Sequence, residues 1–449
     1  MSSLTRSLSL AQASAINVID MVGIGPFVAL SFVMSAMGGA PCMLAWLLGA
    51  LLSMLDGFTW AQLGSALPKA GGSYIFLQKL YGENRWGRLF SFLYIWQTSI
   101  QAPLVIASGA IGFATYFNYV YPVDDFQRKC ISGALVVLIV ALLYRKIGSI
   151  GNISLMLSVV VMGIMLWLIA SGWIYDSPLS VSWAQVWNVT FDKSFFTQLN
   201  EASLKTIYCF LGYYNVCHLG GEIKNPQKNI PRSIFISIAI ITCLYLAMQW
   251  SVLRVISVNE AASHEYVVSM FFEKIYNRQV ALFATGGILI VAFSSLFAVV
   301  LGYSRVPYAA AVDGNYFKIF AKLHPRLNFP YMSLLILGSI AFVFSLLFKM
   351  KEIISAIIVV RILIQFVSQA LGIIIFNKNI EQESPTFKMP LFPLPAILSI
   401  IIWLYIFGWS QWVYIAGAFV IIITGVILFL ILSYQQMKWP FLKNEKSKF

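Results

Sequence analysis

Long apolar stretches recur along the whole 449-residue chain, and they constrain its fold more than any other feature. A stretch of about eighteen or more apolar residues is long enough to cross the hydrocarbon core of a membrane as a helix. Only 10% of the residues are charged, whereas a soluble domain carries about 25%, so the chain has too little polar surface to coat a water-soluble particle. We therefore predict twelve transmembrane helices, at about 12–37, 41–66, 87–120, 129–145, 149–174, 200–219, 232–256, 279–310, 331–348, 353–376, 393–411 and 413–434.

The formal net charge is +13, and the basic residues fall mostly in the short segments between the apolar spans. With the N-terminus placed inside, nineteen Lys and Arg residues lie in inner segments and eight in outer segments. This bias follows the positive-inside rule and predicts that both termini are cytoplasmic. The expected surroundings are the lipids of a bacterial inner membrane. No basic block interleaved with aromatic residues occurs, so nucleic acid is not expected as a partner.

The sequence has no cluster of residues that suggests an enzyme or a metal site. Its five cysteines form no CxxC pair and its three histidines lie far apart, so we expect no metal and no cofactor. No loop is long enough to house a soluble catalytic domain. The GxxxxGK[ST] phosphate-binding pattern is absent, so direct drive by ATP is not expected either.

The first apolar span carries helix-breaking residues near its middle, Gly23, Gly25 and Pro26. In a helix interior Gly costs about 1 kcal/mol and Pro about 3 kcal/mol. Backbone groups freed by a break cannot face lipid, so the span either lines a polar cavity or is a simple kink packed against a neighbour. If a second half-helix starts at Pro26, the amides of Ile24 and Gly25 are free at a positive helix end, which binds carboxylates.

The sixth span has a weaker break signal, Gly212, beside the polar and aromatic residues Tyr208, Tyr213, Tyr214 and Asn215. Spans one and six would open the two halves of a five-plus-five inverted repeat, in which discontinuous helices build a substrate site near the bilayer midplane. The two halves show no strong residue-level similarity. A break in span six is therefore expected from its position as much as from its residues.

Four stretches together resemble the amino acid–polyamine–organocation superfamily. They are GIGPF at 23–27, WAQLGSALPKAGGSY at 60–74, GEIKNPQKNIPR at 221–232 and SRVPYAAAVDG at 304–314. The resemblance covers residues 10–350 and is closest to bacterial permeases near the L-type amino acid transporters. It implies an all-α polytopic membrane protein with the five-plus-five inverted repeat, broken helices one and six, two added C-terminal helices, and alternating access to a central site.

The same resemblance implies a division of the chain. The transport core is expected at 1–392, with the two repeats at about 10–174 and 200–376. The two added transmembrane helices follow at 393–434. A cytoplasmic tail at 435–449 ends the chain.

The resemblance also implies which residues meet the substrate. In the family the substrate carboxylate meets amides of the broken first helix, which match Ile24 and Gly25. The substrate amine meets backbone carbonyls that match Met21, Tyr208 and Leu211, and Tyr208 also matches an aromatic gate. The candidate substrate-binding residues are Met21, Ile24, Gly25, Pro26, Tyr208, Leu211 and Gly212.

The chain departs from the family pattern at three places. Gln62 stands where the family often has Glu, so the stretch at 60–74 has lost a charge. Pro26 replaces a residue that has an N–H group, which removes one donor. Span five, at 149–174, contains no Lys, and Val161 lies near the position where many relatives have a Lys in place of a sodium ion. Coupling through such a lysine is therefore not supported.

Other intramembrane polar residues offer candidates for coupling. Asp20 lies one turn before the break, where an ionised Asp costs about 3 kcal/mol; it is either a proton or cation site, or a carboxylate that bonds loosened backbone. Ser294 and Ser295 in span eight either offer oxygens to sodium or bond the carbonyl of the preceding turn. Asp56 and Arg361 are expected to face the bundle interior, where they can be structural partners.

These observations predict a secondary transporter, a symporter or an exchanger, that carries amino acids. Proton and sodium coupling both remain open. One alternative is a carrier of polyamines, osmolytes or nucleobases on the same fold. The other is a membrane receptor or scaffold that transports nothing.

Overall fold

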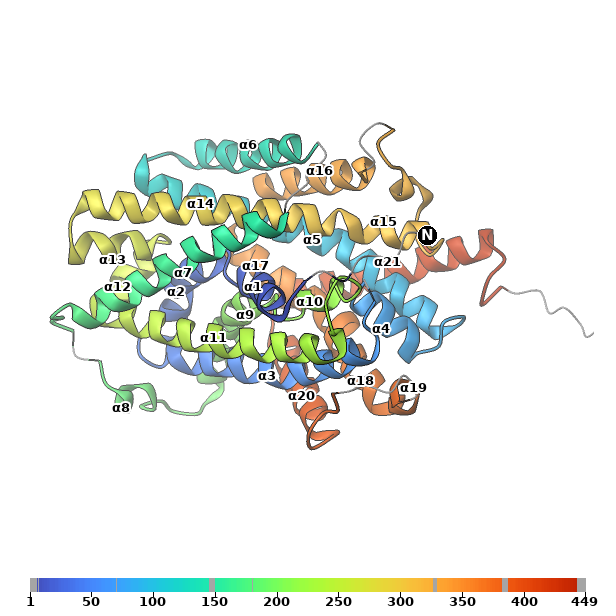
Figure 1. The fold of residues 1–449 in the computed structure, drawn as a ribbon. Coiled ribbons are helices and arrows are strands. Elements are labelled where there is room, and N and C mark those ends of the chain that lie inside the picture. The colour runs from blue at the N-terminus through green and yellow to red at the C-terminus, as the bar shows by residue number, and fades with distance from the viewer. Residues whose placement is uncertain are drawn as a thin grey trace, which may run out of the picture.

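The computed structural model describes residues 6, 8–69, 71–144, 150–179, 181–325, 329–381 and 387–441. These residues form a bundle of helices that run along one common direction (Figure 1). Within these ranges there is no β-strand, and the only β-type pairing is an isolated bridge between Leu8 and Ile223. The all-α prediction is therefore confirmed.

Each predicted apolar span coincides with one helix or with a set of consecutive helices. The first six spans correspond to α1 (Leu10–Met21) with α2 (Gly25–Met37), α3 (Cys42–Ala66), α5 (Trp86–Val120), α6 (Asp125–Leu143), α7 (Ile150–Ile174), and α9 (Lys193–Phe210) with α10 (Asn215–His218). The last six correspond to α11 (Pro226–Val255), α14 (Arg278–Tyr303) with α15 (Arg305–Val312), α16 (Tyr331–Leu347), α17 (Met350–Arg361) with the π-helical segment η2 (Ile362–Val367) and α18 (Ser368–Ile375), α20 (Leu394–Gly408) and α21 (Trp412–Gln435). Short connecting helices are α4 (Ser73–Leu80), α8 (Trp183–Val186), α12 (Val258–Ser263), α13 (Val267–Ile275), η1 (Lys318–Ala321) and α19 (Asn377–Glu381).

Seven helical segments of the described chain are long and apolar enough to cross a membrane, and an eighth crossing results when α1 and α2 count as one bent span. Three further apolar helices are shorter, at Val159–Ile174, Tyr331–Leu347 and Leu394–Gly408. The α9 helix carries Lys193 and Lys205, which make it more polar than an ordinary span. A polytopic membrane protein is established on these grounds, and the number of twelve crossings stays a prediction.

The expected break in the first span is present. The α1 helix ends at Met21, α2 begins at Gly25 with Pro26 in its first turn, and the two axes are bent by 49°. Pro tolerates this position because the N–H that it lacks would have no partner in the first turn of a helix.

The sixth span is also interrupted. The α9 helix ends at Phe210, Leu211 is extended, and Gly212 takes a φ of +119°, which side chains with a Cβ rarely adopt. The chain resumes helical geometry only at Asn215, in the single turn of α10.

Helices from distant parts of the sequence surround the two breaks. The α2 helix packs against α9, α1 packs against α10 and α11, and α3 packs against α9 and α11. Figure 1 shows α1, α9, α10 and α17 in the middle of the bundle, between a layer that contains α5 and α14 and a layer that contains α3 and α11. Both interruptions therefore lie inside the protein, where neighbouring helices can satisfy the loosened backbone.

Candidate functional site

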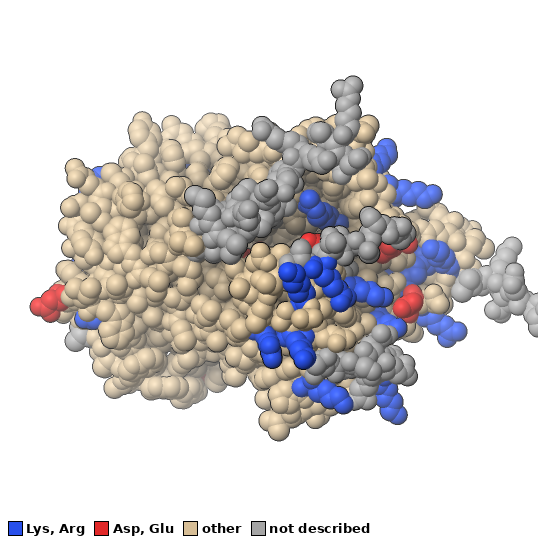
Figure 2. Space-filling model, in the orientation of Figure 1, with Lys and Arg blue, Asp and Glu red and all other residues tan. Residues whose placement is uncertain are grey.

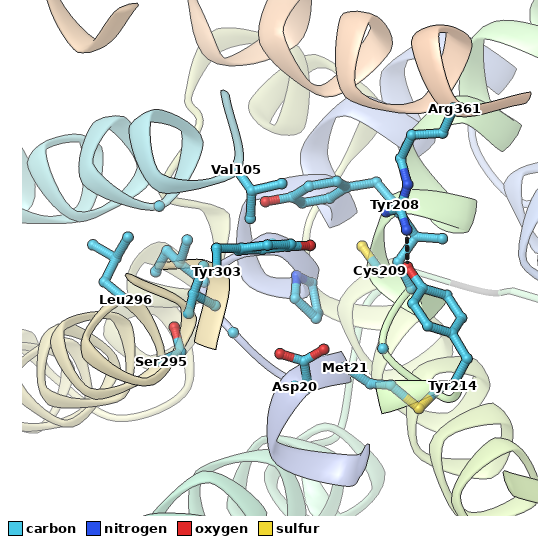
Figure 3. Close-up of a pocket in the computed structure, with 18 residues that line it drawn as sticks. Asp20, Met21, Val105, Tyr208, Cys209, Tyr214, Ser295, Leu296, Tyr303 and Arg361 are labelled. Carbon is cyan, nitrogen blue, oxygen red and sulfur yellow. Dashed lines mark hydrogen bonds between the residues drawn. The ribbon is translucent and has the colours of Figure 1, made fainter. Parts of the chain in front are cut away.

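A cavity of about 80 Å³ lies between the two interrupted spans (Figure 3). The breaks between α1 and α2 and between α9 and α10 supply one part of its wall. The helices α5 and α14 and the last residue of α17 supply the rest. Of the residues singled out in the sequence, those that line the cavity are Asp20, Met21, Gly23, Ile24, Gly25, Pro26, Tyr208, Leu211, Gly212, Tyr214, Ser295 and Arg361.

The start of α2 presents backbone amides to the cavity. Ile24 caps this helix, and its side chain makes no capping hydrogen bond. Among the described residues, none accepts a hydrogen bond from the amide of Ile24 or Gly25. Free amides at a helix N-terminus carry a partial positive charge and bind anions. The cavity therefore has a wall with partial positive charge.

Tyr208 of α9 covers the start of α2. A Cβ placed on Gly25 would lie 2.6 Å from Cε1 of Tyr208, a distance at which two carbon atoms clash, so a larger residue here would have to displace the ring. The Tyr208 hydroxyl shares a hydrogen bond of 2.8 Å with the hydroxyl of Ser108 on α5. The aromatic ring is thus held between α2 and α5 at the edge of the cavity.

The two breaks touch each other directly. A Cβ on Gly212 would lie 2.8 Å from Oδ2 of Asp20 and 2.9 Å from the amide nitrogen of Met21. The hydroxyl of Tyr245 on α11 lies 2.8 Å from the carbonyl oxygen of Met21 and 3.1 Å from that of Cys209, and can donate to either. One side chain therefore links the last turn of α1 to the last turn of α9.

Asn17 provides a second link between the breaks. Its Nδ2 donates to the carbonyl of Tyr213 at 2.7 Å, and its Oδ1 accepts from the amide of Val216 at 2.9 Å. The side-chain amide is completely buried, and it satisfies two backbone groups that the interruption of span six leaves without helical partners.

The carboxylate of Asp20 points into the cavity (Figure 3). Among the described residues, none donates a hydrogen bond to this carboxylate and none forms an ion pair with it. The charged side chain that acts on it electrostatically is Arg361, which lines the same cavity. The carboxylate is therefore available to a cationic ligand or to a proton.

Arg361 reaches the cavity from the end of α17, on the side opposite Asp20 (Figure 3). Its Nε donates to Oε1 of Gln365 at 2.8 Å, and its Nη2 donates to the hydroxyl of Tyr214. The cavity thus holds one acidic and one basic side chain, together with free amides.

The comparison with known proteins decides the family. The model of the amino acid permease family matches residues 8–442. This chain is an amino acid permease by family. The predicted superfamily is confirmed, and because the family consists of transporters, the prediction that the chain is not an enzyme is confirmed as well.

The permease is similar along most of its length to several named transporters. The serine/threonine exchanger SteT of Bacillus subtilis (strain 168) is 25% identical over 423 residues, which cover 88% of this chain and 89% of SteT. The branched-chain amino acid permease BcaP of the same organism is 22% identical over 457 residues, with coverage of 97% and 95%. Solute carrier family 7 member 13 of Mus musculus is 27% identical over 346 residues, with coverage of 75% and 71%.

In the permease, the seven candidate substrate-binding residues surround one cavity, although they come from two distant parts of the sequence. Two of the three carbonyls expected to meet an amine already accept a hydrogen bond. The carbonyl of Met21 lies 2.8 Å from the Tyr245 hydroxyl, and that of Tyr208 accepts from the amide of Leu211 at 3.3 Å. A carbonyl has two lone pairs, so each can still accept from a ligand. What these residues bind stays a prediction.

The two serines of span eight are placed differently from each other. Ser295 lines the cavity, and a Cβ on Gly23 would lie 3.2 Å from its hydroxyl oxygen. Its hydroxyl donates to the carbonyl of Ala292 at 3.2 Å, which is the bond to the preceding turn that the alternative interpretation expects. Ser294 is not among the residues that line the cavity.

Asp56 and Arg361 do not form the structural pair that the sequence left open. Oδ2 of Asp56 accepts from the indole of Trp60 at 2.8 Å and from the hydroxyl of Tyr213 at 2.5 Å. Arg361 instead donates to Tyr214, the neighbour of Tyr213 in the sequence. Asp56 and Arg361 are therefore each hydrogen-bonded to one of two adjacent tyrosines in the interrupted segment of span six, and not to each other.

Apart from Ser295, sequence reasoning missed the part of the wall that α5 and α14 contribute. These lining residues are Val105, Gly109, Leu296, Val299 and Tyr303. Gly109 had a detectable signal, because a glycine within an apolar span often marks a close helix contact. In the structure a Cβ on Gly109 would lie 2.6 Å from the side chain of Leu296. The apolar residues had none, because in a fully apolar span the pattern does not show which face meets a cavity.

Proposed function

We propose that this permease is a secondary transporter of amino acids, working as a symporter or an exchanger. One observation carries the proposal: the amides of Ile24 and Gly25 and the carboxylate of Asp20 line the same cavity, and none of them has a hydrogen-bond partner among the described residues. An amino acid carries an anion and a cation on a single carbon atom, so it complements both walls. The names of the relatives SteT and BcaP support the same class of substrate.

In this proposal the substrate carboxylate accepts hydrogen bonds from the amides of Ile24 and Gly25. The substrate ammonium group meets the carbonyls of Met21, Tyr208 and Leu211, with Asp20 close by. The ring of Tyr208 acts as a gate because it already lies over the start of α2. Pro26 and Gly212 serve the site indirectly, since they create the breaks that free these backbone groups.

Transport is proposed to follow alternating access in a five-plus-five inverted repeat. The positions of the two interruptions, in the first and the sixth span, support this repeat. The proposed core is 1–392, with repeats at about 10–174 and 200–376, and the two added helices are at 393–434. All twelve spans cross the membrane in this arrangement.

The charge distribution supports an orientation with both termini in the cytoplasm of a bacterial cell. Lys and Arg side chains gather at one end of the molecule in the face shown in Figure 2. Figure 1 shows the start of the chain and the end of α21 at this same end. Basic residues are enriched in cytoplasmic segments, so this end is proposed to face inward.

Asp20 is proposed to couple transport to a proton or another cation. The absence of a described hydrogen-bond partner for its carboxylate supports this role over that of a backbone cap. Ser294 and Ser295 remain the candidates for sodium ligands, and of these only Ser295 has support from its position at the cavity.

Reconstitution of the purified protein in liposomes tests the proposed function. Uptake of radiolabelled amino acids is measured one by one, against liposomes without protein. Saturable uptake of at least one amino acid is expected. Movement of a polyamine, an osmolyte or a nucleobase without any amino acid would favour the first alternative. Failure to move any solute would favour a receptor or scaffold, provided that the protein is folded in the liposomes.

A thermal-shift screen gives an independent measurement. A ligand present at 100 times its dissociation constant stabilises the folded state by about 2.7 kcal/mol, so a substrate raises the melting temperature even when transport is slow.

A further inference from the structure

Arg361 is a buried cation that the proposed amino acid site does not use. Only 3% of its surface is exposed, and it lines the cavity. None of the ion pairs found among the described residues includes Arg361. A buried charge is costly when it has no close partner, so a bound anion would lower the cost of burying Arg361.

The surroundings of Arg361 hold its guanidinium group in one orientation. Two of its nitrogens donate to Gln365 and Tyr214, and Cζ lies 5.4 Å and 5.2 Å from the ring centroids of Tyr214 and Phe366. The third nitrogen, Nη1, has no acceptor among the described residues. A planar guanidinium fixed in this way is prepared to bind a carboxylate.

The backbone next to Arg361 also departs from ordinary geometry. The α17 helix ends at Arg361 and continues directly as the π-helical segment η2. Segments of π-helix within α-helices occur frequently at functional sites. The irregularity thus falls at the residue that reaches the cavity.

The charges of the cavity favour one class of side chain on the substrate. The amides at the start of α2 complement the α-carboxylate, and Asp20 together with the carbonyls complements the α-ammonium group. Asp20 and Asp56 act on Arg361 electrostatically from a distance, but no carboxylate among the described residues forms an ion pair with it. A neutral side chain would leave the guanidinium unpaired, and a cationic side chain would meet a like charge. An anionic side chain would supply the missing partner.

Resting on the proposed function, we infer that Arg361 is a specificity-determining residue that binds a second carboxylate, and that the substrates are acidic amino acids. Glutamate and aspartate carry that carboxylate, whereas glutamine and asparagine have nearly the same shape without the charge. The comparison of each acid with its amide therefore isolates the interaction with Arg361.

The test measures uptake of radiolabelled L-glutamate and L-glutamine, and of L-aspartate and L-asparagine, by the reconstituted full chain. Hydrogen bonds to charged groups contribute about 1.5–3 kcal/mol, which corresponds to about 10-fold to 150-fold in affinity. We expect the wild type to prefer each acid over its amide by at least about 10-fold. In R361Q this preference should disappear, with glutamate uptake reduced by a similar factor and glutamine uptake not reduced.

Two further variants complete the test. R361K keeps the charge but loses the planar group, so it should bind glutamate more weakly while still preferring the acid. R254Q is the matched control, because Arg254 lies on α11 away from the cavity and donates to the backbone carbonyls of Trp173 and Tyr175. Its preference should equal that of the wild type.

Two results would overturn the inference. One is a wild type that transports neutral amino acids as well as the acids or better, which needs no variant and holds even if R361Q does not fold. The other is a folded R361Q that keeps the preference for acids, which would leave Arg361 as a support for Tyr214 only. Absence of uptake of every amino acid is a different outcome, since it would overturn the proposed function itself.

Discussion

The aromatic ring of Tyr208 lies against the backbone of Gly25, so closely that a Cβ on Gly25 would come within 2.6 Å of Cε1. This contact joins the last turns of α9 to the first turn of α2, and both residues line the cavity. The absence of a side chain at residue 25 is therefore as important as the position of the ring, because a Cβ there would displace the ring.

Replacement of Gly25 by valine is expected to abolish uptake without preventing membrane insertion. The added side chain would displace Tyr208 and cover the amides at the start of α2. Uptake in proteoliposomes and elution in size-exclusion chromatography measure the two effects. Gly286→Ala is the matched control, since a Cβ at Gly286 meets no atom within 4 Å, and transport by this variant should be unchanged. Normal uptake by Gly25→Val would mean that the amides do not bind the substrate.

Tyr208→Ala is expected to raise the apparent Michaelis constant or abolish transport, because the ring that covers the site is lost. Tyr208→Phe keeps the ring and loses only the hydrogen bond to Ser108, so its effect should be milder. Ser108→Ala removes the same bond from the other side and should match Tyr208→Phe. Transport by Tyr208→Ala at the wild-type level would contradict the role of this residue as a gate.

Asp20→Asn is expected to abolish uptake driven by a pH gradient while it preserves exchange of substrate for substrate. The asparagine side chain cannot take up or release a proton, whereas it has nearly the same shape as the aspartate side chain that lies against Gly212. Uptake with and without an imposed gradient, at several external pH values, separates the two activities. If gradient-driven uptake and its pH dependence stay unchanged, Asp20 is a structural residue.

Glu265, in the segment between α12 and α13, should make the folded protein less stable as the pH rises. Burial raises the pKa of Glu265 above its ordinary value, and the charge of Arg128 and the hydrogen bond from Thr115 lower it only in part. The protonated form is thus favoured by folding, and its contribution to stability is lost as the pH rises through the raised pKa. Glu265→Gln should therefore melt at a higher temperature than the wild type at neutral pH, and at the same temperature at a pH below the ordinary carboxyl pKa.

Glu260, five residues earlier, is the matched comparison with the opposite sign. Slight burial raises the pKa of Glu260, but hydrogen bonds from Ser257 and Lys274 outweigh it and hold the pKa below the ordinary value. Its contribution to stability is present at neutral pH and is lost as the pH falls through the lowered pKa. Glu260→Gln should melt at a lower temperature than the wild type at neutral pH, by the small amount expected for an exposed ion pair. A shift in the same direction for both variants would contradict this assignment.

The apolar spans and the first break could be predicted because each depends on local chemistry. Span length follows from membrane thickness, and Gly25 and Pro26 interrupt a helix by their own backbone properties. Helix ends outside the apolar region could not be found in this way. The α9 helix begins at Lys193, seven residues before the predicted span, because Asp192 caps it with a hydrogen bond to the amide of Phe195.

The rest of the site depends on packing between distant segments. Tyr303 and Arg361 reach the cavity only because α14 and α17 turn particular faces toward the two breaks. Arg361 stood out as an intramembrane charge, but its partner could not be chosen from the sequence, and the structure gives it Tyr214 and not Asp56. Asn17 and Tyr245 carried no signal, since their hydrogen bonds go to backbone groups that are free only after both spans are interrupted.

The β-bridge between Leu8 and Ile223 connects the start of the chain to the segment that follows α10. It consists of main-chain hydrogen bonds, from the amide of Leu8 to the carbonyl of Glu222 at 3.0 Å and from the amide of Lys224 to the carbonyl of Leu8 at 2.9 Å. Because side chains take no part in these two bonds, almost any residue can be substituted at these positions without loss of the hydrogen bonds. Proline is the exception, since at position 8 or 224 it removes the donor itself. The connection between these two segments thus depends on where their backbones lie and hardly at all on which side chains they carry.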